Sequence, residues 1–350
     1  MVTSRLAFWA RRFANWLGIR TGLLRGRWVR FAVEVPGVAA PWSPLAGWWA
    51  GLFSAAWWPW PWSPAAAASD APAAGAPWAP RATWRAAIYR PAGLADDEAA
   101  PLVVVLHGCG QRALGFAHAA GFTREAERRR LRLLAPEQRR GANPHRCWNW
   151  FLPQAQHGRG ELAVVLAAID AAAARVRTSQ VLAVGLSAGG ALAALLAFHH
   201  APRFAAVAVA GAPPLLGRLN LRDPRRVLRE GLGSEPTLAV FGHTGCAPLL
   251  VLHGANDEVV APRCAAQLAE QARAAMGLAR AAAAAPAAAA AGDLERFDAA
   301  GRPLLRLHVL PGLAHGWSGA ARGGHPWVER AGPPLLELVF AFFHARGALR

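Results

Sequence analysis

Residues 180–198, QVLAVGLSAGGALAALLAF, constrain the fold more than any other part of this 350-residue chain. The apolar residues 181–184 fit a buried strand, and the alanine- and leucine-rich residues 190–198 fit a helix. Between them lies Ser187, with glycines two positions before and after it, which keep a tight turn free of collisions. The pattern predicts a nucleophile elbow beside the positive end of a helix. The alternative is a glycine-rich turn that contains a serine by chance.

Two later loops carry the partners that such a serine needs. An apolar strand at 249–252 is followed by Asp257, and a last strand at 304–310 is followed by His315. The acid would orient the histidine and stabilise its cation, and the histidine would take the serine proton. The order serine, aspartate, histidine is that of α/β-hydrolases rather than of chymotrypsin-like or subtilisin-like proteases. We therefore expect an α/β fold with a mostly parallel central sheet and helices on both faces.

A glycine-rich loop at 107–111 follows another apolar run, 101–106. Such a loop at a strand end directs backbone N–H groups into a cleft. We assign the oxyanion hole to the N–H groups of Cys109 and Ala188. His107 is interpreted as a residue that braces this loop rather than as a base.

The segment 147–151, CWNWF, has three aromatic residues in five positions. It is consistent with core packing or with the lining of an apolar substrate cleft. Under the second interpretation Trp148, Asn149 and Trp150 contact substrate, together with Trp317 after the predicted base.

The charge and the cysteines exclude several classes of function. Lysine is absent, and 38 arginines against 21 acidic residues give a net charge of +17. Because the arginines are spread along the chain and no nucleic-acid module is evident, we expect no nucleic-acid partner. The four cysteines, with no CxxC or zinc spacing, are buried thiols or form one or two disulfides: Cys109, Cys147, Cys246 and Cys264. We expect no metal and no cofactor.

The first 80 residues differ in kind from residues 81–350, which we assign to the catalytic domain. They are basic and rich in tryptophan, proline and alanine, and read as an irregular extension and linker. Residues 1–62 suit contact with a membrane or granule surface, but their longest apolar piece, 45–58, is too short to span a bilayer. A signal peptide and a biased extension are the alternatives. Localisation thus stays open between extracellular and cytoplasmic at a granule or membrane surface.

Several segments together resemble the esterases of the poly(3-hydroxybutyrate) depolymerase type, which are related to feruloyl and acetylxylan esterases. They are CWNWF and five others: LHGCGQ at 106–111, PEQ at 136–138, GLSAGG at 185–190, HGANDEVVAP at 253–262 and GLAHGWSG at 312–319. The resemblance implies an α/β-hydrolase fold with Ser187, Asp257 and His315 as triad. It also implies that Cys109 and Cys147 lie close together, with a disulfide as one arrangement. Many members of the family are secreted, and others act inside the cell.

The leading hypothesis is a serine esterase that hydrolyses carboxylic esters through an acyl-enzyme, with poly(3-hydroxybutyrate) or its oligomers as one substrate. A feruloyl- or acetylxylan-type esterase and a catalytically silent scaffold at an interface are the alternatives. Residues 210–217, AGAPPLLG, lack the polar and aromatic character expected in this family, which affects the substrate more than the chemistry.

Overall fold

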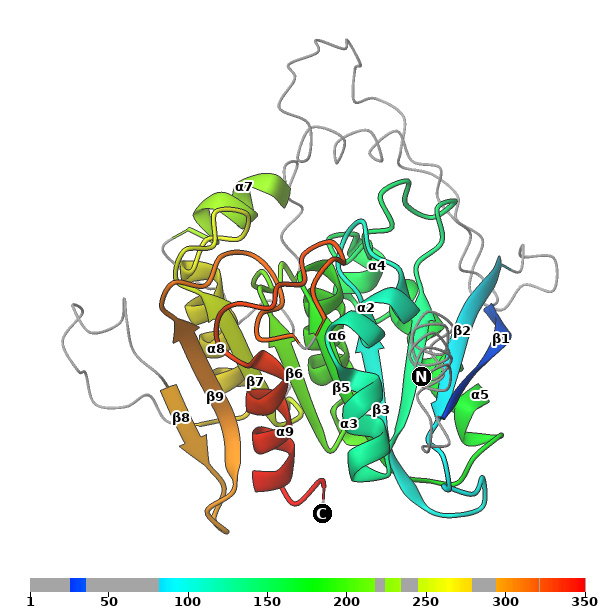
Figure 1. Cartoon of the computed structure of the whole chain (residues 1–350). Helices are drawn as coiled ribbons and strands as arrows, with labels where there is room; N and C mark the ends of the chain where they lie inside the picture. Colours follow the sequence, from blue (N-terminus) through cyan, green and yellow to red (C-terminus); the bar gives the residue numbers. More distant parts are fainter. Residues whose placement is uncertain are drawn as a thin grey trace, which may run out of the picture.

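Figure 1 shows the computed structural model, in which helices cover both faces of a central sheet. The structure describes residues 26–35, 82–217, 224–233, 245–278, 294–320 and 322–349. These form one sheet with the strand order β1-β2-β4-β3-β5-β6-β7-β9-β8. Its strands are β1 (Arg27–Val35), β2 (Ala82–Arg90), β3 (Ala100–Leu106), β4 (Arg132–Glu137), β5 (Thr178–Leu186), β6 (Ala206–Ala210), β7 (Leu249–Gly254), β8 (Leu294–Phe297) and β9 (Pro303–Leu310).

The block from β4 to β9 is parallel, whereas β2 and β8 run antiparallel to it at its two sides and β1 runs antiparallel to β2. Helices α2, α3 and α9 pack on one face, and α5, α6 and α8 pack on the other. This arrangement confirms the predicted α/β-hydrolase architecture. The helices are α2 (Ala113–Ala119), α3 (Phe122–Arg129), α4 (Pro153–Gln156), α5 (Glu161–Ala173), α6 (Ala188–His199), α7 (Pro224–Glu230), α8 (Arg263–Ala275) and α9 (Leu335–Ala345), with a short 3-10 helix at Ala201–Arg203.

The apolar runs form the centre of the sheet because both of its faces are covered. In β3, Val103 and Val105 point into the core beneath α2, α3 and α9, and Leu102 and Val104 point into the core beneath α5, α6 and α8. All four side chains are fully buried, as expected for a strand of a parallel sheet. The loops that follow the parallel strands therefore meet at one edge, where ligands bind in such sheets.

Strand β1 corrects the predicted boundary between extension and catalytic domain. The residues 27–35, assigned to the extension, pair with β2 along its whole length. The physical reason is a period-2 pattern: Val33 and Val35 are buried against the core beneath α5, while Ala32 and Glu34 point to solvent. The remaining residues of the predicted extension, 1–25 and 36–80, lie outside the described residues, so the predicted surface contact stays a prediction.

Several elements were not predicted: the helices α2, α4, α7 and α8 and the edge strand β8. Helix α7 lies in the basic stretch after residue 215. The alanine-rich tract at 279–293 lies outside the described residues. Within the described part of the chain, no helix is long and apolar enough to cross a membrane.

Candidate active site

The turn between β5 and α6 places Ser187 in a backbone conformation that few residues adopt. Its φ is 55° and its ψ is −121°, in the region that normally favours glycine. The neighbouring glycines are required by close approach. A Cβ on Gly185 would collide with the backbone of Gly189, and a Cβ on Gly189 would collide with the carbonyls at the end of β3. Both glycines are therefore sterically required, as predicted from the sequence, and Ser187 lies at the N-terminus of α6.

The three residues predicted as a triad come together above the sheet edge. Ser187 Oγ lies 3.0 Å from His315 Nε2, and His315 Nδ1 lies 2.7 Å from Asp257 Oδ2. The other carboxylate oxygen, Oδ1, accepts hydrogen bonds from the N–H groups of Val259 and Val260 at 2.9 and 2.7 Å. Because the Asp257 carboxylate can only accept, His315 carries its proton on Nδ1 and donates it to Asp257. His315 Nε2 is then free to accept a hydrogen bond from Ser187.

The electrostatics of this group favour an ionised aspartate. Burial raises the pKa of Asp257, but the hydrogen bond and charge of His315 and the N–H of Val260 outweigh it, so the pKa lies below its usual value. Asp257 and His315 are both buried. A charged acid beside a neutral imidazole can stabilise the cation that forms when the imidazole takes a proton.

A second histidine, His253, lies against the same carboxylate and was not predicted. Its Nε2 donates to the carbonyl of Val260 at 2.8 Å and lies 3.4 Å from Asp257 Oδ2. Burial lowers its pKa, so it stays neutral. His253 thereby braces the turn whose N–H groups hold Asp257. Its position at the end of β7, four residues before the acid, is the sequence signal that identifies it.

The loop after β3 uses the N–H groups on both sides of Cys109 within the protein. Gly108 N–H donates to Gln111 Oε1 at 2.7 Å, and Gly110 N–H donates to the carbonyl of His145 at 2.8 Å. Among the described residues, the N–H groups of Cys109 and of Ala188, the first helical residue of α6, have no backbone or side-chain acceptor. Both residues line the pocket that contains Ser187. This is the geometry expected of two oxyanion donors.

His107 braces this loop, as predicted. Its Nε2 accepts from the N–H of Gln138 at 3.1 Å, so the proton is on Nδ1, which donates to the carbonyl of Gly108 at 2.8 Å. The ring is fully buried, and burial lowers its pKa. The carbonyl of His107 accepts from Trp148 Nε1 at 3.1 Å. These contacts are structural, and none of them reaches Ser187.

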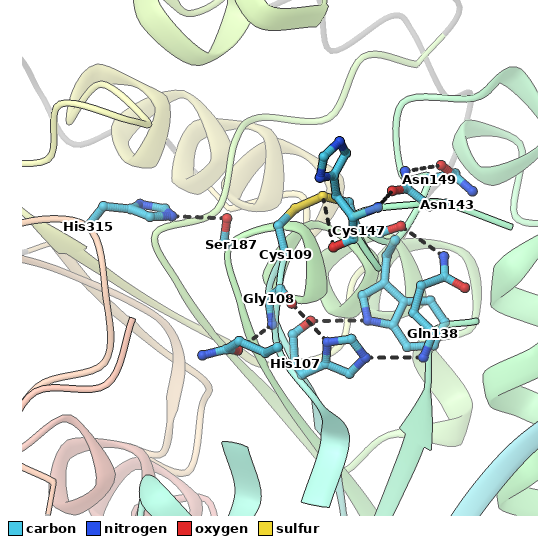
Figure 2. The surroundings of a disulfide bond; sticks show 12 residues. His107, Gly108, Cys109, Gln138, Asn143, Cys147, Asn149, Ser187 and His315 are labelled. Atoms are coloured by element: carbon cyan, nitrogen blue, oxygen red, sulfur yellow. Dashed lines mark hydrogen bonds between the residues drawn. A yellow bond between two sulfur atoms is a disulfide. The ribbon is translucent and has the colours of Figure 1, made fainter. Parts of the chain in front are cut away.

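A disulfide joins the loop to the CWNWF segment. Figure 2 shows Ser187 between His315 on one side and the Cys109–Cys147 bond on the other. The two Cα atoms are 4.2 Å apart, and 38 positions separate the cysteines in sequence. The pairing implied by the family resemblance is thus confirmed. The other two cysteines, Cys246 and Cys264, are free thiols whose pKa burial raises.

The sequence matches the model of the family described as Esterase PHB depolymerase over residues 84–295, more than half of the chain. The chain belongs to this family. Poly(3-hydroxyalkanoate) depolymerase C from Paucimonas lemoignei is 26% identical over 259 residues, which cover 71% of this chain and 62% of that protein. The chain therefore spans less than two thirds of the length of this relative.

A solved structure supports the fold. Acetyl xylan esterase from Aspergillus awamori is similar with a TM-score of 0.55 at 16% identity, over 75% of this chain and 94% of that chain. At this identity the likeness establishes the α/β-hydrolase fold alone.

The pocket of this PHB depolymerase-type chain is small and apolar. Its free volume is ≈ 20 Å³, about enough for one water. Its lining residues are Gly108, Cys109, Trp150, Leu186, Ser187, Ala188, Pro213, Leu228, Val259, Val260, His315 and Trp327. Of the four predicted substrate contacts, the pocket includes Trp150, and Trp327 was not predicted.

The other three predicted contacts are wrong for this structure. Trp148 is fully buried and stacks on Trp84, with ring centroids 6.4 Å apart. Trp317 is fully buried and meets Phe116 edge to face at 5.6 Å. Asn149 is buried too, and its side-chain amide donates to Glu161.

The polar network around Glu161 holds the CWNWF segment in place. Glu161 Oε1 accepts from Gln138 Nε2 and Asn149 Nδ2, each at 2.7 Å, and Oε2 accepts from the N–H of Asn149 at 2.6 Å. Asn149 Oδ1 in turn accepts from Asn143 at 3.0 Å. The hydrogen bonds from Gln138 and Asn149 lower the pKa of Glu161, but burial outweighs them and raises it to about 7. Asn149 is therefore a structural residue, which anchors the segment that carries Cys147 and Trp150.

In the part of the chain that the structure describes, no cluster of three or more histidine, cysteine, aspartate or glutamate side chains is arranged to hold a metal ion.

Proposed function

We propose that this member of the PHB depolymerase family is a serine esterase in which Ser187 is the nucleophile, His315 the base and Asp257 the acid that orients it. The observation that carries the proposal is the chain of contacts from Ser187 Oγ to His315 Nε2 at 3.0 Å and from His315 Nδ1 to Asp257 at 2.7 Å. The strained backbone of Ser187 supports it, since such strain clusters at functional sites.

The acylation step follows from these positions. His315 Nε2 takes the proton of Ser187 as its Oγ attacks the ester carbonyl carbon, and the carbonyl oxygen becomes an oxyanion. The N–H groups of Cys109 and Ala188 donate to that oxygen. The imidazolium then gives its proton to the alcohol oxygen, the ester C–O bond breaks, and the acyl group stays on Ser187.

Deacylation uses the same groups. A water loses a proton to His315 Nε2 as its oxygen attacks the acyl carbon, and the second oxyanion lies in the same hole. Collapse releases the carboxylic acid and returns the proton to Ser187. Asp257 stays ionised throughout, in keeping with the direction of its pKa.

For the substrate, we propose poly(3-hydroxybutyrate) or its oligomers. The support is the family match and the name of the relative, poly(3-hydroxyalkanoate) depolymerase C. A feruloyl- or acetylxylan-type esterase is the second candidate, favoured by the structural neighbour named as an acetyl xylan esterase. Attachment of residues 1–62 to a granule or membrane surface fits the first candidate and remains part of the proposal.

The test is hydrolysis of p-nitrophenyl butyrate by the full chain and by Ser187→Ala. Ser179→Ala, an exposed position at the other end of β5, is the matched control. We expect the rate to fall to background in Ser187→Ala and to stay unchanged in Ser179→Ala. Hydroxybutyrate oligomers and feruloyl esters then separate the two substrate candidates. A folded wild-type protein without activity would instead favour the catalytically silent scaffold.

A further inference from the structure

Trp327 has a backbone conformation that a tryptophan rarely adopts. Its φ is 59°, in the left-handed region that suits glycine. In the described part of the chain, three other non-glycine residues have a positive φ: Arg130, Arg146 and Ser187. Of these four, Ser187 and Trp327 line the candidate active-site pocket. A strained bulky residue at such a place points to a role for its side chain.

The local turn explains the strain. The N–H of Val328 donates to the carbonyl of His325 at 3.0 Å, which closes a four-residue turn with Pro326 and Trp327 at its centre. Proline fixes a negative φ, so a positive φ at the next residue makes this a type II turn. That turn type favours glycine where Trp327 stands. Tryptophan at this position is disfavoured by the backbone, so contacts elsewhere in the folded chain must hold it there.

A buried glutamine ties the turn to the oxyanion loop. Gln111 is fully buried; its Nε2 donates to the carbonyl of Pro326 at 2.5 Å, and its Oε1 accepts from the N–H of Gly108 at 2.7 Å. The Pro326 carbonyl belongs to the central peptide group of the turn, whose orientation distinguishes type II from type I. Gln111 therefore fixes that orientation, and with it the direction of the next side chain.

The indole then meets both the base and the pocket. Its ring lies edge to face against the His315 imidazole, with centroids 5.6 Å apart and an interplanar angle of 76°. The carbonyl of Trp327 accepts from the N–H of Trp317 at 2.8 Å, which fastens the turn to the loop that carries His315. Trp327 is half-buried and lines the apolar pocket beside Ser187.

We propose that Trp327 is a specificity-determining residue: its indole forms the wall that limits the length of the acyl group on Ser187, and Gln111 is the positioning residue that holds it there. The inference rests on the proposed esterase function. In this conformation the free volume beside Ser187 is ≈ 20 Å³, so a long acyl chain would meet the indole, and removal of the indole from the wall would enlarge the pocket.

The experiment compares kcat/KM for p-nitrophenyl acetate, butyrate and octanoate in the wild type, Trp327→Gly and Trp327→Phe. Glycine suits the backbone of the turn, so the first variant is expected to fold. We expect the octanoate-to-butyrate ratio to rise by about tenfold or more in Trp327→Gly, and by less in Trp327→Phe. Arg130→Gly is the matched control, since it relieves the same type of strain at the end of α3 and should leave the ratio unchanged.

An unchanged ratio in both Trp327 variants would overturn the inference. If Trp327→Gly fails to fold, as judged by its thermal transition, Trp327→Phe alone decides by the same ratio. Ser187→Ala, measured beside them, separates this failure from that of the proposed function. Activity that survives in Ser187→Ala contradicts the esterase mechanism, whereas activity lost there with an unchanged chain-length ratio contradicts only the role of Trp327.

Discussion

The buried carboxylate of Glu161 offers a quantitative test of the network behind the oxyanion loop. The group receives three hydrogen bonds, yet burial raises its pKa from 4.5 to about 7. The folded protein therefore holds a proton at a pH where the unfolded chain has released it. The stability that this proton contributes is fully present below about pH 4.5 and is lost as the pH rises through about 7.

The magnitude follows from the two pKa values. A difference of about 2.5 corresponds to about 3 kcal/mol of unfolding free energy. In Glu161→Gln the side chain is neutral at every pH and cannot contribute to this dependence. We expect the wild type to lose about 3 kcal/mol relative to Glu161→Gln between pH 4.5 and pH 8.

Urea unfolding at several pH values, with the disulfide intact, measures this difference. Glu337→Gln, at an exposed position on α9, is the matched control and should follow the wild type at every pH. A stability difference between wild type and Glu161→Gln that does not vary with pH would refute the reasoning. If the wild type instead gained stability relative to Glu161→Gln as the pH rises, the three donors, rather than burial, would determine the pKa of Glu161.

Two further predictions follow from close packing. A Cβ on Gly211 would lie 3.1 Å from the His315 ring, so Gly211→Ala should lower kcat by about tenfold through displacement of the base. Gly93 also has a positive φ, but a Cβ there would meet nothing within 4 Å, so Gly93→Ala is the matched control. An equal loss of activity in both variants would argue against the contact with His315. In β1, Val33→Asp buries a charge and should destabilise the protein by about 3 kcal/mol or more, whereas Ala32→Asp on the exposed face should cost under about 0.5 kcal/mol in thermal or urea unfolding. Equal effects of the two aspartates would contradict the placement of β1 in the sheet.

Local sequence predicted the nucleophile elbow, Asp257 and His315 because each lies in a short segment with a recognisable pattern. Gly185 and Gly189 are glycines since no side chain fits there, and that requirement is visible without the fold. The order of Ser187, Asp257 and His315 along the chain then indicated one architecture. Continuous apolar runs indicated the central strands. Because helices cover both faces of these strands, apolar and polar residues do not alternate along them.

What the sequence did not predict depends on distant neighbours. Trp148 and Trp150 are two residues apart in one irregular segment and both are buried in the core. Only the folded chain decides that Trp148 stacks on Trp84 whereas Trp150 also borders the pocket. Strand β1 was missed because its partner lies beyond 46 intervening residues, numbers 36 to 81. The pair proline–tryptophan at 326–327 does signal a turn, but the bridge from Gln111 that fixes it arises only in the folded chain.

The proposed mechanism requires that His315 activate Ser187 as a nucleophile. Its most direct test is reaction of the intact protein with an organophosphonate probe, followed by peptide mass mapping, in the wild type and in His315→Ala. We predict an adduct on Ser187 in the wild type, and labelling at least about a thousandfold slower without the imidazole. The absence of an adduct on Ser187, or an equal labelling rate in both proteins, would contradict it.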